Sequence, residues 1–304
     1  MRNELAKSLY QQAKKNKNIF VIVADISPAG KMQDFQKEFP DRFINTGVAE
    51  QVMIGLSAGL AIKKKIPFVY TIATFALYRP FEMIRVDLCY QNLPVCVVGM
   101  GGGTIYSNLG PTHLTQEDIS IARSIPNLQV LAPCDPYELK NCINYLVQKS
   151  KHPTYLRIGK TGEKNFLLNN SEKWYFGKIR KLVSGKKICF ISFGPIINKA
   201  FEIKENLNKI KIFPSIYSCH TLKPFDKLGI KKIFKKYKKI VIIEDHSEIG
   251  GLAEIIKLSA LENKYYGQIF SFSLKDEFIK CYSSQDDLLT LHGINNKKII
   301  KKIL

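Results

Sequence analysis

The sequence predicts an α/β protein in which two mostly parallel sheets are covered by helices. Three observations lead to this fold class. Short runs rich in β-branched residues alternate with longer helical patterns, many of those runs are apolar on both faces, and one polar stretch divides the chain. Continuous apolar runs are typical of strands buried between two layers of helices. With 304 residues, the chain has room for two domains of ordinary size.

The first half of the chain begins with an amphipathic helical pattern over residues 1–18. Five strands are then predicted: Phe20–Ala24, Phe68–Ile72, Val95–Gly99, Gln129–Ala132 and Tyr155–Ile158. A further strand leads into a turn at Gly47. After this turn, Met53, Leu56 and Leu60 follow helical spacing and mark the apolar stripe of a helix.

The second half repeats the alternation of strands and helices. Its predicted strands are Ile188–Phe193, Phe213–Tyr217, Ile240–Glu244 and Ile269–Phe272. Between the two halves the pattern dissolves into Lys, Asn, Gly and Glu around the single Trp174. We therefore expect a first domain over residues 1–158, a linker over 159–186 and a second domain over 187–304.

Composition excludes several classes of protein. No apolar run reaches the roughly 18 residues that a membrane-spanning helix needs. The N-terminal pattern lacks the continuous apolar segment of a secretory signal, so a cytoplasmic protein is predicted. The seven cysteines are scattered without a Cys-x-x-Cys pair or clustered His partners, which indicates reduced thiols rather than a zinc site or a disulfide framework.

The net charge of +20 permits an anionic partner. Much of the excess lies in lysine runs such as 63–65, 231–239 and 297–302, which carry no aromatic stacking pattern within them. A solvated lysine surface is therefore the simpler interpretation, with an acidic partner or substrate as the alternative. Neither nucleic acid nor a membrane is predicted as a partner.

The most informative string is Gly47-Val48-Ala49-Glu50-Gln51, which precedes a glycine-rich helix. Taken singly, its residues have ordinary explanations, because an acid in a first turn favours the helix dipole. Further strings follow the same order as in one family: Ala24-Asp25, Thr74-Phe75, Gly110-Pro111-Thr112-His113, Arg157, Lys223-Pro224-Phe225-Asp226 and Glu244-Asp245-His246-Ser247-x-x-Gly250-Gly251. Together they resemble the C-terminal part of transketolase, a family of thiamine-diphosphate enzymes that includes 1-deoxyxylulose-5-phosphate synthase.

The resemblance implies a pyrimidine-binding domain followed by a transketolase C-terminal domain. Glu50 then matches the glutamate that hydrogen-bonds the ring nitrogen of the cofactor's aminopyrimidine, a role that needs a carboxyl group able to share a proton. Phe75 resembles the aromatic residue that packs on the pyrimidine face. Tyr78 and Phe81 are further candidates for cofactor contacts.

The resemblance also implies a substrate site. His113 matches the histidine that hydrogen-bonds sugar hydroxyls and moves protons, a task suited to imidazole. Arg157 resembles the arginine that binds the phosphate of sugar phosphates, with a domain-linking salt bridge as the alternative. Asn108 stands near the position of a usual aspartate, and Gly101-Gly102-Gly103 replaces a usual channel histidine. The pattern Tyr106-Ser107-Asn108-Leu109 is similar to transketolase-like pairs associated with unusual carbohydrate biosynthesis, which implies a specialised sugar.

The sequence contains no Gly-Asp-Gly, the motif with which this family binds Mg²⁺ and the cofactor's diphosphate. A diphosphate needs a cation or donors to offset its charge. The resemblance therefore implies a separate N-terminal subunit that carries the Mg²⁺-diphosphate domain, with no metal ligands in this chain. We expect self-association through the pyrimidine-binding domain and a dimer of heterodimers.

These inferences predict a transketolase-like subunit that transfers a two-carbon ketol unit from a ketose or ketose phosphate to an aldose through thiamine diphosphate. Specialised carbohydrate biosynthesis is the expected setting. Three alternatives remain at this point: the beta subunit of a 2-oxo-acid dehydrogenase, half of a deoxyketose synthase, and a non-catalytic regulatory or scaffold subunit.

Overall fold

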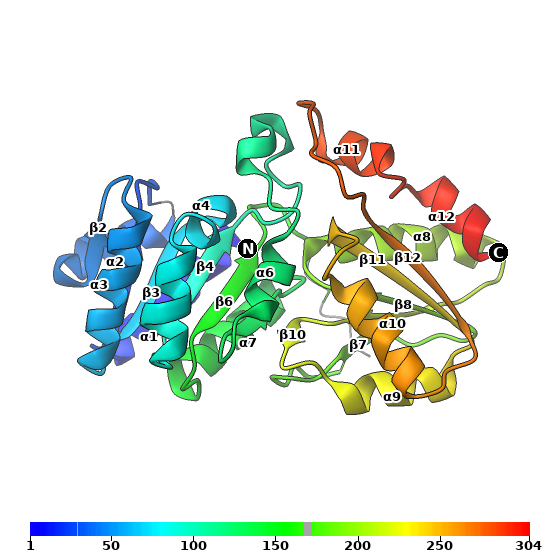
Figure 1. Ribbon diagram of the computed structural model, residues 1–304, viewed down its shortest axis with the longest axis horizontal. Coiled ribbons are helices and arrows are strands. Elements are labelled where there is room, and N and C mark those ends of the chain that lie inside the picture. The colour runs from blue at the N-terminus through cyan, green and yellow to red at the C-terminus, as the bar shows by residue number, and fades with distance from the viewer. Residues whose placement is uncertain (29, 167–171) are drawn as a thin grey trace.

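A computed structural model describes residues 1–28, 30–166 and 172–304. Figure 1 shows two α/β units side by side, with the first half of the chain on the left and the second half on the right. Each unit contains one mostly parallel sheet flanked by helices. The predicted fold class is thereby confirmed.

The first sheet has the strand order β10-β5-β6-β4-β3-β1-β2. Its strands are β1 (Ile19–Val23), β2 (Phe43–Asn45), β3 (Ile66–Ile72), β4 (Cys96–Met100), β5 (Gln129–Leu131), β6 (Thr154–Ile158) and β10 (Thr221–Lys223). Every pairing is parallel except that of β10 with β5. All residues of β4 and β6 are buried, as expected for strands covered on both faces.

The second sheet has the order β12-β11-β8-β9-β7. Its strands are β7 (Arg180–Val183), β8 (Ile188–Ser192), β9 (Ser215–Ser218), β11 (Lys239–Ser247) and β12 (Gln268–Leu274), of which β7 alone among the described strands of this sheet is antiparallel to its neighbour. Each of the nine strands predicted with bounds overlaps an observed one. β7 lies inside the segment predicted as a linker, and β10 crosses from the second half of the chain to complete the first sheet.

Helices cover both faces of each sheet. In the first unit they are α1 (Arg2–Lys15), α2 (Lys31–Glu38), α3 (Glu50–Ile62), α4 (Ala73–Leu77), α5 (Phe81–Met83), the π-helix η2 (Ile84–Tyr90), α6 (Asp118–Ser124) and α7 (Pro136–Gln148). In the second they are α8 (Asn198–Lys209), α9 (Lys227–Lys236), α10 (Leu252–Glu262), α11 (Gln285–Leu291) and α12 (Asn296–Ile303). Short 3₁₀ turns η1 (Pro40–Arg42), η3 (Ser107–Leu109), η4 (Pro111–His113) and η5 (Pro195–Ile197) complete the set. Within the described ranges, every helix is too short or too polar to cross a bilayer.

Two layers of side chains enclose the first sheet. Residues of α1, α2 and α7, such as Leu9, Phe35 and Leu139, pack on one face. Residues of α3, η2 and α6, such as Met53 and Ile119, pack on the other face. The second layer continues into the second unit, where α9 and α10 join the same apolar cluster. A shared core of this kind fixes the two units relative to each other.

The order of the strands points to a ligand site before any residue is considered. The chain passes from β1 to β2 on one side and then returns to place β3 on the other side of β1. In open α/β sheets, ligands bind outside the carboxyl ends of the strands where the order reverses in this way. Here that position lies beyond Val23 and Ile72, the last residues of β1 and β3.

Candidate active site

Glu50 lies where the chain turns from β2 into α3. The Asn45 side chain accepts hydrogen bonds from the backbone N–H groups of Asp25 and Gly47, at 3.1 and 3.0 Å, and so ties the ends of β1 and β2 together. Gly47 has a φ of 68°, which a residue with a side chain rarely adopts. The turn delivers Glu50 to the first position of α3, where it is only 2% exposed.

A guanidinium group joins Glu50 to Phe75. An Arg79 N–H donates to Oε2 of Glu50 at 2.9 Å, and the Arg79 Cζ lies 5.2 Å from the centre of the Phe75 ring. Phe75 lies on α4, which follows β3 without a connecting loop. The ends of β2 and β3 thus supply a carboxylate and an aromatic face to one place. Sequence reasoning missed Arg79; its position four residues after Phe75, in the turn that follows α4, was the available signal.

His113 extends this group. Its ring meets the Phe75 ring edge to face at 5.3 Å between centres, and the centre of the Tyr106 ring lies 6.3 Å from that of His113. Nδ1 of His113 is 2.9 Å from the Thr112 hydroxyl. No hydrogen bond to Nε2 is found among the described residues. Glu50, Phe75 and His113, three of the predicted site residues, therefore form one connected group with Arg79.

The other predicted contacts lie apart from this group. The Tyr78 hydroxyl donates to Oε2 of Glu117 at 2.9 Å, and burial raises the pKa of Tyr78 well above its usual range. Phe81 packs against the apolar core. Asn108 is exposed on η3, the turn just before the one that carries His113. The roles of Tyr78, Phe81 and Asn108 stay predictions.

Arg157 holds the two units together. Its Nε donates to Oδ2 of Asp118 at 2.9 Å, and a terminal nitrogen donates to the backbone oxygen of Asp245 at 2.7 Å. The residue is 4% exposed, and its guanidinium lies 5.4 Å from the centre of the Phe193 ring. Asp118 belongs to the first unit, and Asp245 and Phe193 belong to the second. This is the domain-linking arrangement that the sequence left open as the alternative to phosphate binding.

The glycine run after β4 packs against this ion pair. A Cβ at Gly102 would lie 2.4 Å from Arg157 Nε, and one at Gly103 would lie 2.2 Å from an Asp245 oxygen. Thr104 adds hydrogen bonds from its backbone N–H and its hydroxyl to the Asp245 carboxylate. Asp245 of the second unit thus holds the loop in place. A histidine side chain at Gly102 or Gly103 has no room without rearrangement.

A cluster of possible metal ligands lies elsewhere, and its carboxylates accept hydrogen bonds from other groups of the protein. Ligand atoms of Cys134, Asp135 and Glu138 lie within 4.8 Å of one another and are buried. Glu138 accepts hydrogen bonds from Arg180 and from the backbone N–H of Cys134, and Asp135 accepts from the backbone N–H of Glu138. These contacts join α7 to β7. Asp135 and Glu138 therefore have a structural role that accounts for their burial.

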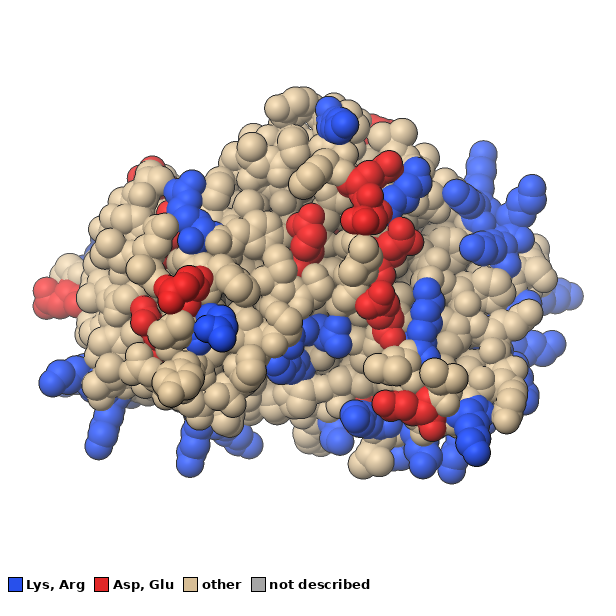
Figure 2. Space-filling model, in the orientation of Figure 1, with Lys and Arg blue, Asp and Glu red and all other residues tan. Residues whose placement is uncertain are grey.

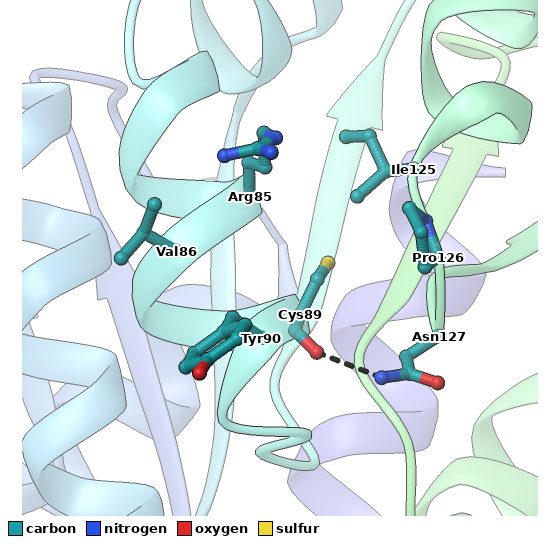
Figure 3. Close-up of a pocket in the computed structure, with 7 residues that line it drawn as sticks. All are labelled: Arg85, Val86, Cys89, Tyr90, Ile125, Pro126 and Asn127. Carbon is teal, nitrogen blue, oxygen red and sulfur yellow. Dashed lines mark hydrogen bonds between the residues drawn. The ribbon is translucent and has the colours of Figure 1, made fainter.

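A pocket of about 560 Å³ lies away from this group, between η2 and the chain that follows α6 (Figure 3). Its lining residues are Arg85, Val86, Cys89, Tyr90, Ile125, Pro126 and Asn127. Burial raises the pKa of the Cys89 thiol to about 12, so this thiol is not a nucleophile near neutral pH. The pocket contains none of the predicted site residues.

Comparison with known proteins identifies the family of the two units. Residues 1–162 match the family described as transketolase, pyrimidine binding domain, and residues 177–299 match transketolase, C-terminal domain. A transketolase C-terminal section from Methanocaldococcus jannaschii is 36% identical over 310 residues, covering 100% of this chain and 95% of the relative. One of the subunits of apulose-4-phosphate transketolase, from Phocaeicola vulgatus, is 29% identical over 303 residues, covering 100% and 96%.

A solved structure gives the same result in three dimensions. It is a split gene transketolase, described as an inactive beta4 tetramer, and it superposes with a TM-score of 0.86 at 29% identity, covering 99% of this chain and 96% of that one. Both halves of the present chain therefore match transketolase domains. The chain belongs to the transketolase family, whose members depend on thiamine diphosphate.

Proposed function

We propose that this chain is the C-terminal subunit of a two-chain enzyme that transfers a two-carbon ketol unit from a ketose or ketose phosphate to an aldose. A role in specialised carbohydrate biosynthesis is part of the proposal. The observation that carries it is the connected group of Glu50, Phe75 and His113 at the carboxyl ends of the sheet. These residues supply a carboxylate and an aromatic face for the cofactor and an imidazole for the sugar.

The residues present fit the pyrimidine end of thiamine diphosphate. Oε1 of Glu50 makes no hydrogen bond to any described residue, whereas Oε2 is held by Arg79. The hydroxyl of Thr74, next to Phe75, is buried and has no partner in the described chain. An aminopyrimidine would give Oε1 of Glu50 a partner and would cover the Phe75 ring. When bound, the cofactor supplies the carbon nucleophile of the reaction.

The side chains then have separate tasks. Oε1 of Glu50 would hold the ring nitrogen of the pyrimidine and share a proton with it, in a buried position that strengthens the hydrogen bond. Phe75 would hold the pyrimidine by packing on its face. His113, held at Nδ1 by Thr112, directs Nε2 to the sugar, where it holds a hydroxyl and exchanges a proton with it. Asn108 remains a candidate for a second sugar contact.

A second subunit is needed for the other end of the cofactor. This chain has no Gly-Asp-Gly string, so we assign Mg²⁺ and the diphosphate to an N-terminal partner subunit. Two similar proteins support a divided enzyme, because one is named as a single subunit of a transketolase and another is described as a split gene transketolase. The active site would then lie between the two chains.

The outer face of α3 supports self-association. Val52 and Leu56 are 59% and 37% exposed, and Val48 just before the helix is 68% exposed. A Cβ at Gly55 or Gly59 would meet nothing within 4 Å, so this face is open to a close-packed partner. Leu56 therefore does not share the inward stripe with Met53, as the sequence had suggested. A second copy of the chain on this face gives a dimer of heterodimers.

Reconstitution with the N-terminal subunit tests the proposal. The complex should transfer ketol units with thiamine diphosphate and Mg²⁺, and Glu50→Gln should lower kcat/KM by about 10²- to 10⁴-fold. Glu82→Gln, on an exposed residue of α5, is the matched control and should leave the rate unchanged. Full activity in the Glu50 variant would refute the assignment. Turnover only with a 2-oxo acid and a dye acceptor would favour the dehydrogenase alternative.

A further inference from the structure

The second unit has a pocket of about 270 Å³ whose charged lining residues are all lysines. It lies between the end of α9, the turn after α10 and the start of β12. Lys231, Lys235, Lys238 and Lys264 contribute to its walls, and no acidic residue of the described chain lines it. Figure 2 shows Lys and Arg gathered at the lower right of the molecule, with acidic side chains beside them, where Figure 1 places α9.

These four lysines have no ion-pair partner among the described residues. All four are exposed. Glu262 is close in sequence but does not line the pocket. Four like charges around one hollow repel one another and attract an anion with several charges. Phosphate groups are the anions that lysine ammonium groups commonly bind in proteins.

Aromatic rings form the rest of the pocket. The Tyr266 side chain is 91% exposed at its edge. Beside it, the Tyr265 ring stacks on Phe234 with centres 4.7 Å apart, and its hydroxyl donates to the backbone oxygen of Tyr237 at 3.0 Å. Tyr265 and Phe234 are therefore fixed, whereas Tyr266 presents a free face. An exposed aromatic face beside cationic groups suits a flat ring that carries phosphates.

The backbone closes this part of the surface tightly. A Cβ at Gly267 would lie 2.6 Å from the backbone oxygen of Lys238. Only glycine therefore allows these two segments of the backbone to approach as closely as they do. This approach brings Tyr266 beside the lysines of α9, from which it is separated by about 30 residues of sequence. The lysine run itself contains Phe234 and Tyr237, and the fold adds Tyr265 and Tyr266 from the turn before β12.

We propose that this pocket binds a nucleoside di- or triphosphate, with the phosphates on the four lysines and the base on Tyr266. The pocket lies at the amino ends of β11 and β12, whereas Asp245 and the contact with the first unit lie toward the carboxyl end of β11. The site is therefore separate from the Glu50 group. It is independent of the proposed ketol transfer.

Isothermal titration of the full chain with ATP and with inorganic tripolyphosphate tests the proposal. Both ligands should bind, and Lys235→Ala combined with Lys238→Ala should weaken both by about tenfold or more. Tyr266→Ala should weaken ATP by about fivefold and leave tripolyphosphate unchanged. Lys297→Ala combined with Lys301→Ala, on the exposed side of α12, removes the same charge elsewhere and should change neither affinity.

Three results would overturn the proposal. The first is the absence of saturable binding up to about 1 mM of either ligand. The second is an equal loss in the two double variants, because that would show attraction to net charge rather than to a site. The third is a Tyr266→Ala variant that binds ATP as the wild type does, which would remove the base from the proposal. Circular dichroism of each variant checks that the fold is retained.

Discussion

Arg79 and Glu50 form an ion pair in which the carboxylate is buried and the guanidinium reaches solvent. The Glu50 side chain is 3% exposed and the Arg79 side chain is 42% exposed. The pair fixes Oε2 and leaves Oε1 without a partner in the described chain. We conclude that Arg79 is a positioning residue, because it sets the orientation of the carboxylate that the proposed reaction uses.

Replacing Arg79 should therefore affect the reaction more than the fold. In the reconstituted complex, Arg79→Met should lower kcat/KM by up to about 100-fold, because the Glu50 carboxylate loses its orientation. The loss in unfolding free energy should be about 1 kcal/mol, because the pair is partly exposed. Arg79→Lys retains the charge and should recover much of the rate.

Arg85→Met is the matched control for Arg79. Arg85 is exposed on η2 and lines the separate pocket of Figure 3. Its replacement should leave the kinetic constants unchanged. A purely structural role for Arg79 would instead show as equal losses of stability and activity in Arg79→Met, with no recovery in Arg79→Lys.

Arg157 should behave in the opposite way. Arg157→Met leaves the buried carboxylate of Asp118 without its charge partner and should lower the free energy of unfolding by about 3–5 kcal/mol. The single tryptophan, Trp174, reports the change, because its ring lies 5.1 Å from His220, just before β10, and 6.3 Å from Tyr145 on α7. A variant of wild-type stability with a raised KM for a sugar phosphate would restore the phosphate-binding role.

Glu244 should make stability depend on pH. Burial raises the pKa of Glu244 from 4.5 to about 7. A raised pKa means that the folded chain binds this proton more tightly, so the contribution to stability is complete below about pH 4.5 and is lost as the pH rises through 7. The loss should total about 3 kcal/mol. It should be absent in Glu244→Gln.

The comparison of wild type with Glu244→Gln is needed because another group acts in the opposite direction. Burial lowers the pKa of His220 to about 3, so its contribution is lost as the pH falls. Urea unfolding of both proteins at several pH values from 4.5 to 7.5 isolates Glu244 by difference. A constant difference across this range would contradict the assignment.

Self-association should depend on the outer face of α3. Val52→Glu places a charge in the proposed contact between copies, where burial without a partner is unfavourable. Sedimentation of the complex should then show a heterodimer in place of the dimer of heterodimers. Leu258→Glu, on an exposed position of α10, is the control and should leave the assembly intact. Dissociation of both variants alike would argue against this face.

The parts of the fold predicted from sequence are those with continuous apolar runs. Strands such as β4 and β6 are buried throughout, and their composition alone identifies them. β7 was missed because its buried and half-buried residues alternate over only four positions and begin with Arg180. β10 was missed because it is three residues long and antiparallel to its neighbour. Such short strands depend on the sheet they join.

The site divides in a similar way. Glu50, Phe75 and His113 stand in recognisable strings, and the fold brings them together. Arg79 was not predicted, because its partner lies 29 residues away and only the folded chain shows the pair. In the sequence, the Gly101–Gly103 loop stands where the family usually has a channel histidine. In the structure it is a close approach to Arg157 and Asp245, which no local pattern reveals.

We expect this chain to complete an active site together with a second subunit. Native mass spectrometry of the tagged protein recovered from its own cells tests this most directly, because it reads partner, stoichiometry and bound cofactor together. We predict two copies of this chain with two copies of a Gly-Asp-Gly subunit, together with thiamine diphosphate and Mg²⁺. A self-associated chain that binds neither partner nor cofactor, also after the purified N-terminal subunit is added, would contradict the account.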